Sequence, residues 1–259
     1  MAEYETIRRA SAGARTSEID EGLRAHMNKV YGLMSVAMVI TGVISLAMAS
    51  IASTTDPTQE VAKLGNGVML TDVGAALYLS AFRWVVLLAP LGMVMFLASR
   101  IHKLSMATAQ TMFYVYSGLV GVSISSIFLI YTGESVATTF FVTAIAFASL
   151  SLYGYTTKRD LSGMGSFLIM GVVGLIVAMI VNIFLQSAAI MFAISTLGVL
   201  IFAGLTAYDT QKIKSVYLAH AQGGDQEWLG KSAIMGALNL YLDFLNMFMF
   251  LLMFLGNRE

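Results

Sequence analysis

Seven long apolar stretches, separated by short polar segments, dominate the chain. They cover residues 28–52, 76–99, 107–131, 136–155, 164–185, 188–208 and 233–255. A helix needs about 20 consecutive apolar residues to cross the hydrocarbon core of a bilayer, and each stretch reaches that length. The pattern therefore predicts an all-α integral membrane protein with seven transmembrane helices.

The composition agrees with this class. Hydrophobic residues make up 58% and charged residues 12% of the 259 residues, against about 45–50% and about 25% in soluble domains. The chain has no cysteine, which excludes disulfides, thiolate metal sites and cysteine nucleophiles.

The polar and apolar segments define two regions. Residues 1–27 form a polar N-terminal tail that we expect to be loosely ordered, and residues 28–256 form the transmembrane domain. Because the tail lacks the apolar core of a cleavable signal peptide, we expect the first membrane helix to act as its own uncleaved signal.

The positive charges fall unevenly on the two sides of this topology. With a cytoplasmic N-terminus, only Lys63, Arg83 and Arg258 of the 15 Lys and Arg residues fall outside. The inner segments hold the other twelve, which are Arg8, Arg9, Arg15, Arg24, Lys29, Arg100, Lys103, Lys158, Arg159, Lys212, Lys214 and Lys231. The positive-inside rule therefore predicts a cytoplasmic N-terminus and an outer C-terminus. Six spans followed by a re-entrant segment would leave the C-terminus inside, and that alternative stays open.

Two aspartates in or beside the last two apolar stretches are the main candidates for function. Asp209 directly follows the sixth stretch and Asp243 lies within the seventh. An ionised aspartate at the centre of a bilayer costs about 2.5–3.5 kcal/mol even on the lenient insertion scale. Each should therefore face the interior of the helix bundle and have a partner, and the simplest partner for one is the other.

Polar residues accompany both aspartates at helical spacing. Asn239 and Asn246 lie four residues before and three residues after Asp243, and Thr206 lies three residues before Asp209, so each set shares one helix face. Two such polar stripes predict a seam between the two helices. Asn239, Asn246 and Thr206 then either line a pore or hold the helices together by hydrogen bonds.

A pair of neighbouring carboxylates has a specific chemistry. Two carboxylates within hydrogen-bonding distance tend to share one proton, because two adjacent negative charges repel. Protonated, the pair would fasten the two helices together. Deprotonated, it would repel and offer oxygen ligands, which suit a hard cation such as calcium. Asp209 and Asp243 are thus candidates for a pH sensor, a gate and a transient metal-ion site, with no resident cofactor expected.

Three segments resemble those of a known family. Ala207-Tyr-Asp-Thr-Gln-Lys-Ile213 and Leu240-Tyr-Leu-Asp-Phe-Leu-Asn246 are similar to the two signature segments of the Bax inhibitor family, the transmembrane Bax-inhibitor-motif proteins. Ser151-Leu-Tyr-Gly-Tyr-Thr-Thr-Lys-Arg-Asp-Leu161 resembles a turn of its bacterial branch. The resemblance covers residues 28–256 in the same motif order.

The resemblance implies a fold and a function. It implies six helices surrounding a central C-terminal helix, and a pH-sensitive calcium leak gated by Asp209 and Asp243 in the inner membrane of a bacterium. It also implies an arginine near the end of the second helix that can latch onto the first aspartate. Arg100 is the best match for this latch, and Lys103 competes with it.

Two other classes of protein are alternatives to a leak channel, an intramembrane protease and an interaction protein. Intramembrane aspartyl proteases also pair two aspartates, but their second aspartate follows glycines that let substrate approach, whereas Leu240-Tyr-Leu precedes Asp243 here. We therefore expect no enzymatic activity. The main alternative is an interaction protein, in which the N-terminal tail modulates a membrane-anchored AAA protease or a stress or cell-death response.

Overall fold

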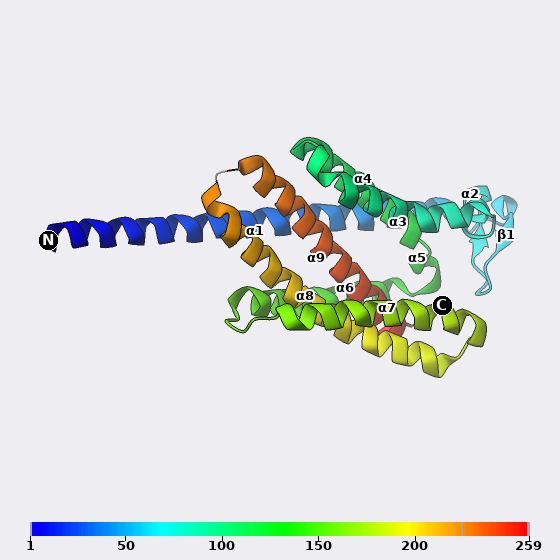
Figure 1. Cartoon of the computed structure of the whole chain (residues 1–259). Coiled ribbons are helices and arrows are strands. Elements are labelled where there is room, and N and C mark those ends of the chain that lie inside the picture. Colours follow the sequence, from blue (N-terminus) through cyan, green and yellow to red (C-terminus); the bar gives the residue numbers. More distant parts are fainter. Residues whose placement is uncertain (1, 224, 258–259) are drawn as a thin grey trace.

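The computed structural model describes residues 2–223 and 225–257, and for residues 2–18 and 222 it describes the backbone alone. Its long helices are α1 (Ala2–Ala52), α3 (Phe82–Arg100), α4 (Met106–Ile124), α6 (Gly133–Thr156), α7 (Ser162–Leu185), α8 (Ala188–His220) and α9 (Gln226–Leu255) (Figure 1). In the part of the chain that is described, seven helical segments are long and apolar enough to cross a membrane. The predicted class of membrane protein with seven spans is confirmed.

Short elements connect these helices. Between α1 and α3 lie η1 (Pro57–Gln59), β1 (Ala62–Lys63), β2 (Met69–Leu70) and α2 (Asp72–Tyr78). The remaining short helices are η2 (Ile101–Lys103), α5 (Ile127–Ile130) and η3 (Ala221–Gly223). β1 and β2 pair antiparallel, with Ala62 opposite Leu70, and the turn between them uses Gly67 at a φ of 90°, a conformation that glycine adopts without strain.

Three boundaries differ from the sequence expectation. The tail was expected to be loosely ordered, whereas the backbone of α1 is helical from Ala2 onwards. The second span begins at Phe82, after the separate helix α2, and not at residue 76. α8 continues to His220, so the polar segment that follows the sixth apolar stretch begins as helix. Polarity alone does not end a helix, and residues 210–220 contain helix-forming Gln, Lys, Leu and Ala and no Gly or Pro.

The path of the chain places its two ends at opposite ends of the bundle (Figure 1). α9 is an unbroken helix of 30 residues, which corresponds to a length of roughly 45 Å. After it, the backbone N–H of Asn257 donates to Ser135 Oγ (3.0 Å), and its carbonyl accepts from the Thr132 N–H (3.1 Å). α9 therefore runs through the bundle and does not turn back, as a re-entrant segment would.

α9 is the most buried of the seven helices. In the most apolar 18 residues of each helix, 56% of the residues are buried in α9, against 44% or less in the other helices. It packs against α8, α1, α6 and α4, while α7 packs mainly on α8, and α3 on α4 and α2. The ring of six helices around α9 that the resemblance implies is thus not confirmed, because α3 and α7 lie against other helices.

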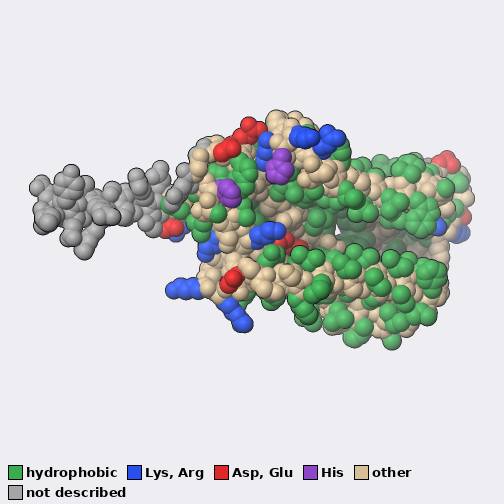
Figure 2. Space-filling model, viewed as in Figure 1, with side chains coloured by type: hydrophobic (Ala, Val, Ile, Leu, Met, Phe, Trp, Pro, Cys, Tyr) green, Lys and Arg blue, Asp and Glu red, His purple; other side chains and the backbone are tan. Residues whose placement is uncertain are grey.

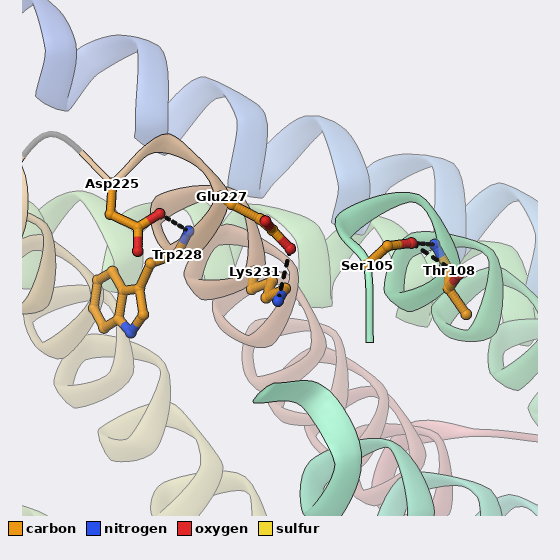
Figure 3. Close-up of polar contacts among 6 residues, drawn as sticks. All are labelled: Ser105, Thr108, Asp225, Glu227, Trp228 and Lys231. Atoms are coloured by element: carbon orange, nitrogen blue, oxygen red, sulfur yellow. Dashed lines mark hydrogen bonds and ion pairs between the residues drawn. The ribbon is translucent and has the colours of Figure 1, made fainter. Parts of the chain in front are cut away.

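Side-chain caps fix the start of α4 and α9 (Figure 3). Asp225 Oδ1 accepts from the backbone N–H of Trp228 at 2.9 Å, and Ser105 Oγ accepts from that of Thr108 at 3.2 Å. Such caps satisfy N–H groups that have no partner within the helix. In the next turn of α9, Lys231 Nζ lies 2.9 Å from Glu227 Oε1.

The surface divides into an apolar body and a charged end (Figure 2). Hydrophobic side chains cover the body, and Lys and Arg gather where the long N-terminal helix leaves it. The side chains of Arg8, Arg9, Arg15 and Arg258 lie outside the part described in atomic detail. An apolar surface of this kind is normal where lipid is the solvent, whereas it would be unusual on a soluble monomer.

Candidate functional site

The candidate site lies where α8 and α9 pack along each other. These two helices form the most extensive helix contact in the protein. Asp209 comes from the middle of α8 and Asp243 from the middle of α9. The two carboxyl groups lie within hydrogen-bonding reach of each other. The structure thus brings together the two aspartates that the sequence singled out.

The two aspartates have different surroundings. Asp243 is 4% exposed, whereas Asp209 is half-buried. Asp243 Oδ2 has no hydrogen-bond partner among the described residues. Two ionised carboxylates cannot bond to each other, because both only accept hydrogen bonds. A proton held between them supplies the missing donor, and without it a buried oxygen stays unsatisfied at a cost of about 1–3 kcal/mol.

A lysine of α8 itself interacts with this pair. Lys212 lies three residues after Asp209, one helical turn away, and interacts with it electrostatically. Its Nζ also lies 5.9 Å from the ring centroid of Tyr208. No role beside Asp209 was predicted for Lys212, although its spacing of three residues from Asp209 is visible in the sequence.

The structure does not bring the proposed latch to the aspartates. Arg100 is exposed at the end of α3, with its guanidinium carbon 5.9 Å from the ring centroid of Phe96. Lys103 is exposed in η2. Neither forms an ion pair with an aspartate within the described chain. The reason is the packing of α3, which lies on α4 and α2.

The polar residues of the two predicted stripes are buried or half-buried on α8 and α9. Thr206 is fully buried, and its hydroxyl donates to the Phe202 carbonyl at 2.8 Å. Asn246 is half-buried and donates through Nδ2 to the Leu242 carbonyl at 2.8 Å, while Asn239 is half-buried. Thr206 and Asn246 therefore bond within their own helices and do not join α8 to α9.

A hydroxyl chain that the sequence analysis missed reaches the same turn of α8. The Thr210 hydroxyl donates to the Thr206 carbonyl at 2.8 Å and accepts from Ser151 Oγ of α6 at 2.9 Å. Ser151 Oγ in turn bonds to the Tyr31 hydroxyl of α1. Three helices are thus joined at the residue that follows Asp209.

Gly154 allows α6 to approach α8 at this point. A Cβ at position 154 would lie 2.2 Å from the carbonyl oxygen of Ala207, a separation that no side chain tolerates. Membrane helices pack closely through such small residues. The glycine in the turn segment over 151–161 therefore has a steric role beside the aspartate.

The pair does not form a complete metal site. Within the described residues, no group of three or more His, Asp or Glu side chains is arranged to hold a metal ion. Calcium takes about six to eight oxygen ligands. The two carboxyl groups of Asp209 and Asp243 alone supply fewer oxygens than that.

Comparisons with known proteins identify the family. Residues 23–259 match the family model described as inhibitor of apoptosis-promoting Bax1. A protein of Caulobacter vibrioides is 46% identical over 242 residues, which cover 93% of this chain and 92% of the relative. The inner membrane protein YbhL of Escherichia coli is 41% identical over 238 residues, with 92% and 94% covered. A Rickettsia prowazekii protein is 42% identical over 246 residues and 95% of both chains. The chain therefore belongs to the Bax inhibitor-1 family, as a membrane protein with seven helices able to span a bilayer.

Proposed function

We propose that this protein is a pH-sensitive leak channel for calcium or a similar hard cation, gated by Asp209 and Asp243. The observation that carries the proposal is the buried Asp243 carboxylate, whose Oδ2 lacks a hydrogen-bond partner in the described structure while Asp209 lies within reach. Polar groups that only hold helices together need not be ionisable, and an intramembrane carboxylate is costly. A site that tolerates this cost is a candidate for gating.

The proposed gate works through one proton. With the proton shared, the pair forms a neutral bridge between α8 and α9, and the seam is closed. When the proton leaves, two negative charges face each other in a medium of low dielectric constant, and their repulsion separates the helices. The freed oxygens then bind a passing cation. Flux therefore rises with pH.

The proposed location is the inner membrane of a bacterium, with the N-terminus in the cytoplasm. It rests on the printed name of the Escherichia coli relative and on the uneven distribution of Lys and Arg. In this orientation Asp209 and Lys212 lie nearer the cytoplasmic end of α8.

Calcium flux in liposomes tests the proposal. The pure protein is reconstituted, and flux is followed between about pH 6 and pH 8 for wild type, Asp209→Asn and Asp243→Asn. We expect the wild-type flux to rise with pH and both variants to lose that dependence, because an amide keeps a donor in the pair at every pH. Asp20→Asn, at an exposed carboxylate of α1, is the matched control and should behave as wild type.

Two results would contradict the proposal. One is a folded wild-type protein with no flux above that of empty liposomes. The other is an unchanged pH dependence in both variants. In the first case an interaction protein that acts through its N-terminal tail becomes the better explanation, and truncation of residues 1–18 would abolish its effect on a partner protease.

A further inference from the structure

A long groove opens on the side of the bundle between α1 and α6. It has a volume of about 1000 Å³. Its walls are the facing sides of α1 and α6, and Phe244 of α9 also lines it. α9 packs against both α1 and α6 and so spans the space between them (Figure 1). The groove is open to the surroundings of the protein, and within a membrane those surroundings are lipid.

The lining changes from polar to apolar along the groove. The residues at the end nearer the N-terminus include the polar Arg24, Asn28, Tyr31, Ser151 and Tyr155, together with the apolar Met27 and Leu152. Beyond them, α1 contributes an apolar stretch from Met34 to Leu46 that includes Val39 and Val43, and α6 contributes Phe140 and Ala144. Thr41 and Ser45 of this stretch do not line the groove, and Ser35 is the one polar side chain of α1 that lines this part of it.

The dimensions match one leaflet of a bilayer. Met34 to Leu46 covers 12 helical steps, or roughly 18 Å at about 1.5 Å per residue. One leaflet contributes half of a hydrocarbon core of about 30 Å. Arg24 lies ten residues before Met34, or roughly 15 Å along the helix, on the polar side of this stretch. The apolar part of the groove thus has the length of an acyl chain.

The charge at the polar end selects the ligand. Arg24 is the one charged residue among those that line the groove, and it is exposed and absent from the ion pairs of the described residues. A guanidinium binds a phosphate through two parallel hydrogen bonds. A transmembrane helix of another protein would bring neither a phosphate nor a narrow chain to this groove.

We propose that the groove between α1 and α6 is a binding site for one membrane phospholipid, with its phosphate on Arg24 and its acyl chains along Met34–Leu46. The Asn28 and Tyr31 side chains lie beside Arg24 on the same face of α1, where they can contact the headgroup and the glycerol esters. This proposal does not rest on the proposed leak function, since it concerns binding alone.

Native mass spectrometry of the full chain tests the site. The delipidated protein in detergent is mixed with dioleoylphosphatidylglycerol, and bound lipid is counted against lipid concentration. We expect a single lipid to be retained. Arg24→Gln should weaken its binding roughly tenfold, as expected for a lost hydrogen bond between charged groups, and Arg24→Lys should restore part of the loss. Dioleoylglycerol, which lacks the phosphate, should bind as weakly as the lipid binds to Arg24→Gln.

A pair of glycines on α1 provides the matched control for the apolar part. Gly42 lines the groove, and a Cβ there meets nothing within 4 Å, so the side chain of Gly42→Leu starts in open space and extends into the groove. Gly32 has equally open space but is not part of the groove. We expect Gly42→Leu to reduce lipid retention and Gly32→Leu to leave it unchanged, with both variants eluting as folded protein.

Several outcomes would overturn the proposal. Equal retention by wild type, Arg24→Gln and Gly42→Leu would mean that lipid coats the surface without a site. Equal binding of dioleoylglycerol would remove the role of the phosphate. A second copy of the chain retained in place of lipid would identify the groove as a protein interface.

Discussion

Two polar sites on different faces of α9 show how differently a membrane protein treats buried polar groups. The first is centred on Tyr241, which is fully buried, and its hydroxyl lies 2.6 Å from Thr41 Oγ1. Thr41 is also within 2.9 Å of the Ser117 carbonyl. The second site is centred on Asp243, two residues further along and therefore on a different face. There, Oδ2 has no partner in the described structure.

The difference separates a structural role from a functional one. At the first site the hydroxyls have partners, and the Tyr241 ring packs at 5.7 Å against Phe113 and at 5.9 Å against Tyr116. Satisfied polar groups in a membrane join helices and add a modest stability of about 0.6 kcal/mol for each hydrogen bond. At the second site a hydrogen bond is missing unless a proton is present. A buried group that depends on a proton responds to pH, whereas a satisfied one does not.

Removal of the Tyr241 side chain should give the largest effect. Tyr241→Ala leaves a cavity where α9 meets α1 and α4, and we expect a loss of about 3–5 kcal/mol of unfolding free energy, as for large aromatic truncations in cores. Thermal unfolding in detergent measures it. Tyr241→Phe keeps the ring and should cost only about 1 kcal/mol. Wild-type stability of Tyr241→Ala would show that the first site does not hold the bundle together.

The contact between α6 and α8 beside Asp209 should be nearly as sensitive. Gly154→Ala places a methyl group 2.2 Å from the Ala207 carbonyl oxygen, so the helices must separate. The expected cost is about 1–3 kcal/mol, typical of overpacking. Gly163→Ala is the matched control, because a Cβ there meets nothing within 4 Å. Equal unfolding temperatures for the two variants would rule out a close approach at Gly154.

Replacement of one carboxylate by an amide should stabilise the second site at high pH. Asp243→Asn gives the pair a permanent donor, because Nδ2 donates to the Asp209 carboxylate. Relative to wild type, we expect a gain of about 1.5–3 kcal/mol where both aspartates are ionised and no gain where they share a proton. Unfolding measured at two pH values checks this. If Asp243→Asn were less stable than wild type at both pH values, the result would contradict the interpretation that an oxygen of the ionised pair lacks a donor.

The cation beside Asp209 should have a smaller effect. Lys212→Gln removes a positive charge that favours the ionised carboxylate, so the flux–pH profile should move to higher pH. Because Lys212 is exposed and screened by solvent, we expect a shift below about one pH unit. Arg100→Gln should leave the profile unchanged. If Arg100→Gln shifted the profile and Lys212→Gln did not, the result would favour the latch implied by the family resemblance.

The smallest effect is expected at Asp56, an exposed carboxylate that accepts two hydrogen bonds from Thr58. The Thr58 backbone N–H and hydroxyl bond to Asp56 Oδ1 at 2.9 and 2.8 Å and hold the pKa of that carboxyl below its usual value. A lowered pKa in the folded state stabilises the loop above the unfolded pKa, and this contribution is lost as pH falls through the folded value. The protection of the amides of residues 58–60 against hydrogen exchange, relative to the intrinsic rate at each pH, should therefore decrease below about pH 4. Asp56→Asn should be less sensitive to this change, and an equal response would contradict the cap.

The sequence predicted the main elements and the aspartate pair, but not their surroundings. The runs of apolar residues were sufficient to place seven helices. The cost of a charge in lipid was sufficient to predict that Asp209 and Asp243 lie next to each other. The hydrophobic pattern does not predict the extension of α8 to His220, because the residues after Tyr208 are largely polar although they favour helix. The hydroxyl chain from Tyr31 through Ser151 to Thr210 was missed because its members lie 120 and 59 residues apart.

By itself, the sequence determined the class of protein, the number of long helices and the residues that could titrate inside the membrane. These properties follow from local composition and from the free energy of moving single residues into hydrocarbon. Only the tertiary structure decided which polar groups of α9 are satisfied, and that α1 and α6 leave a groove between them. Those properties depend on how helices distant in sequence pack, and packing is set by the shapes of many side chains at once.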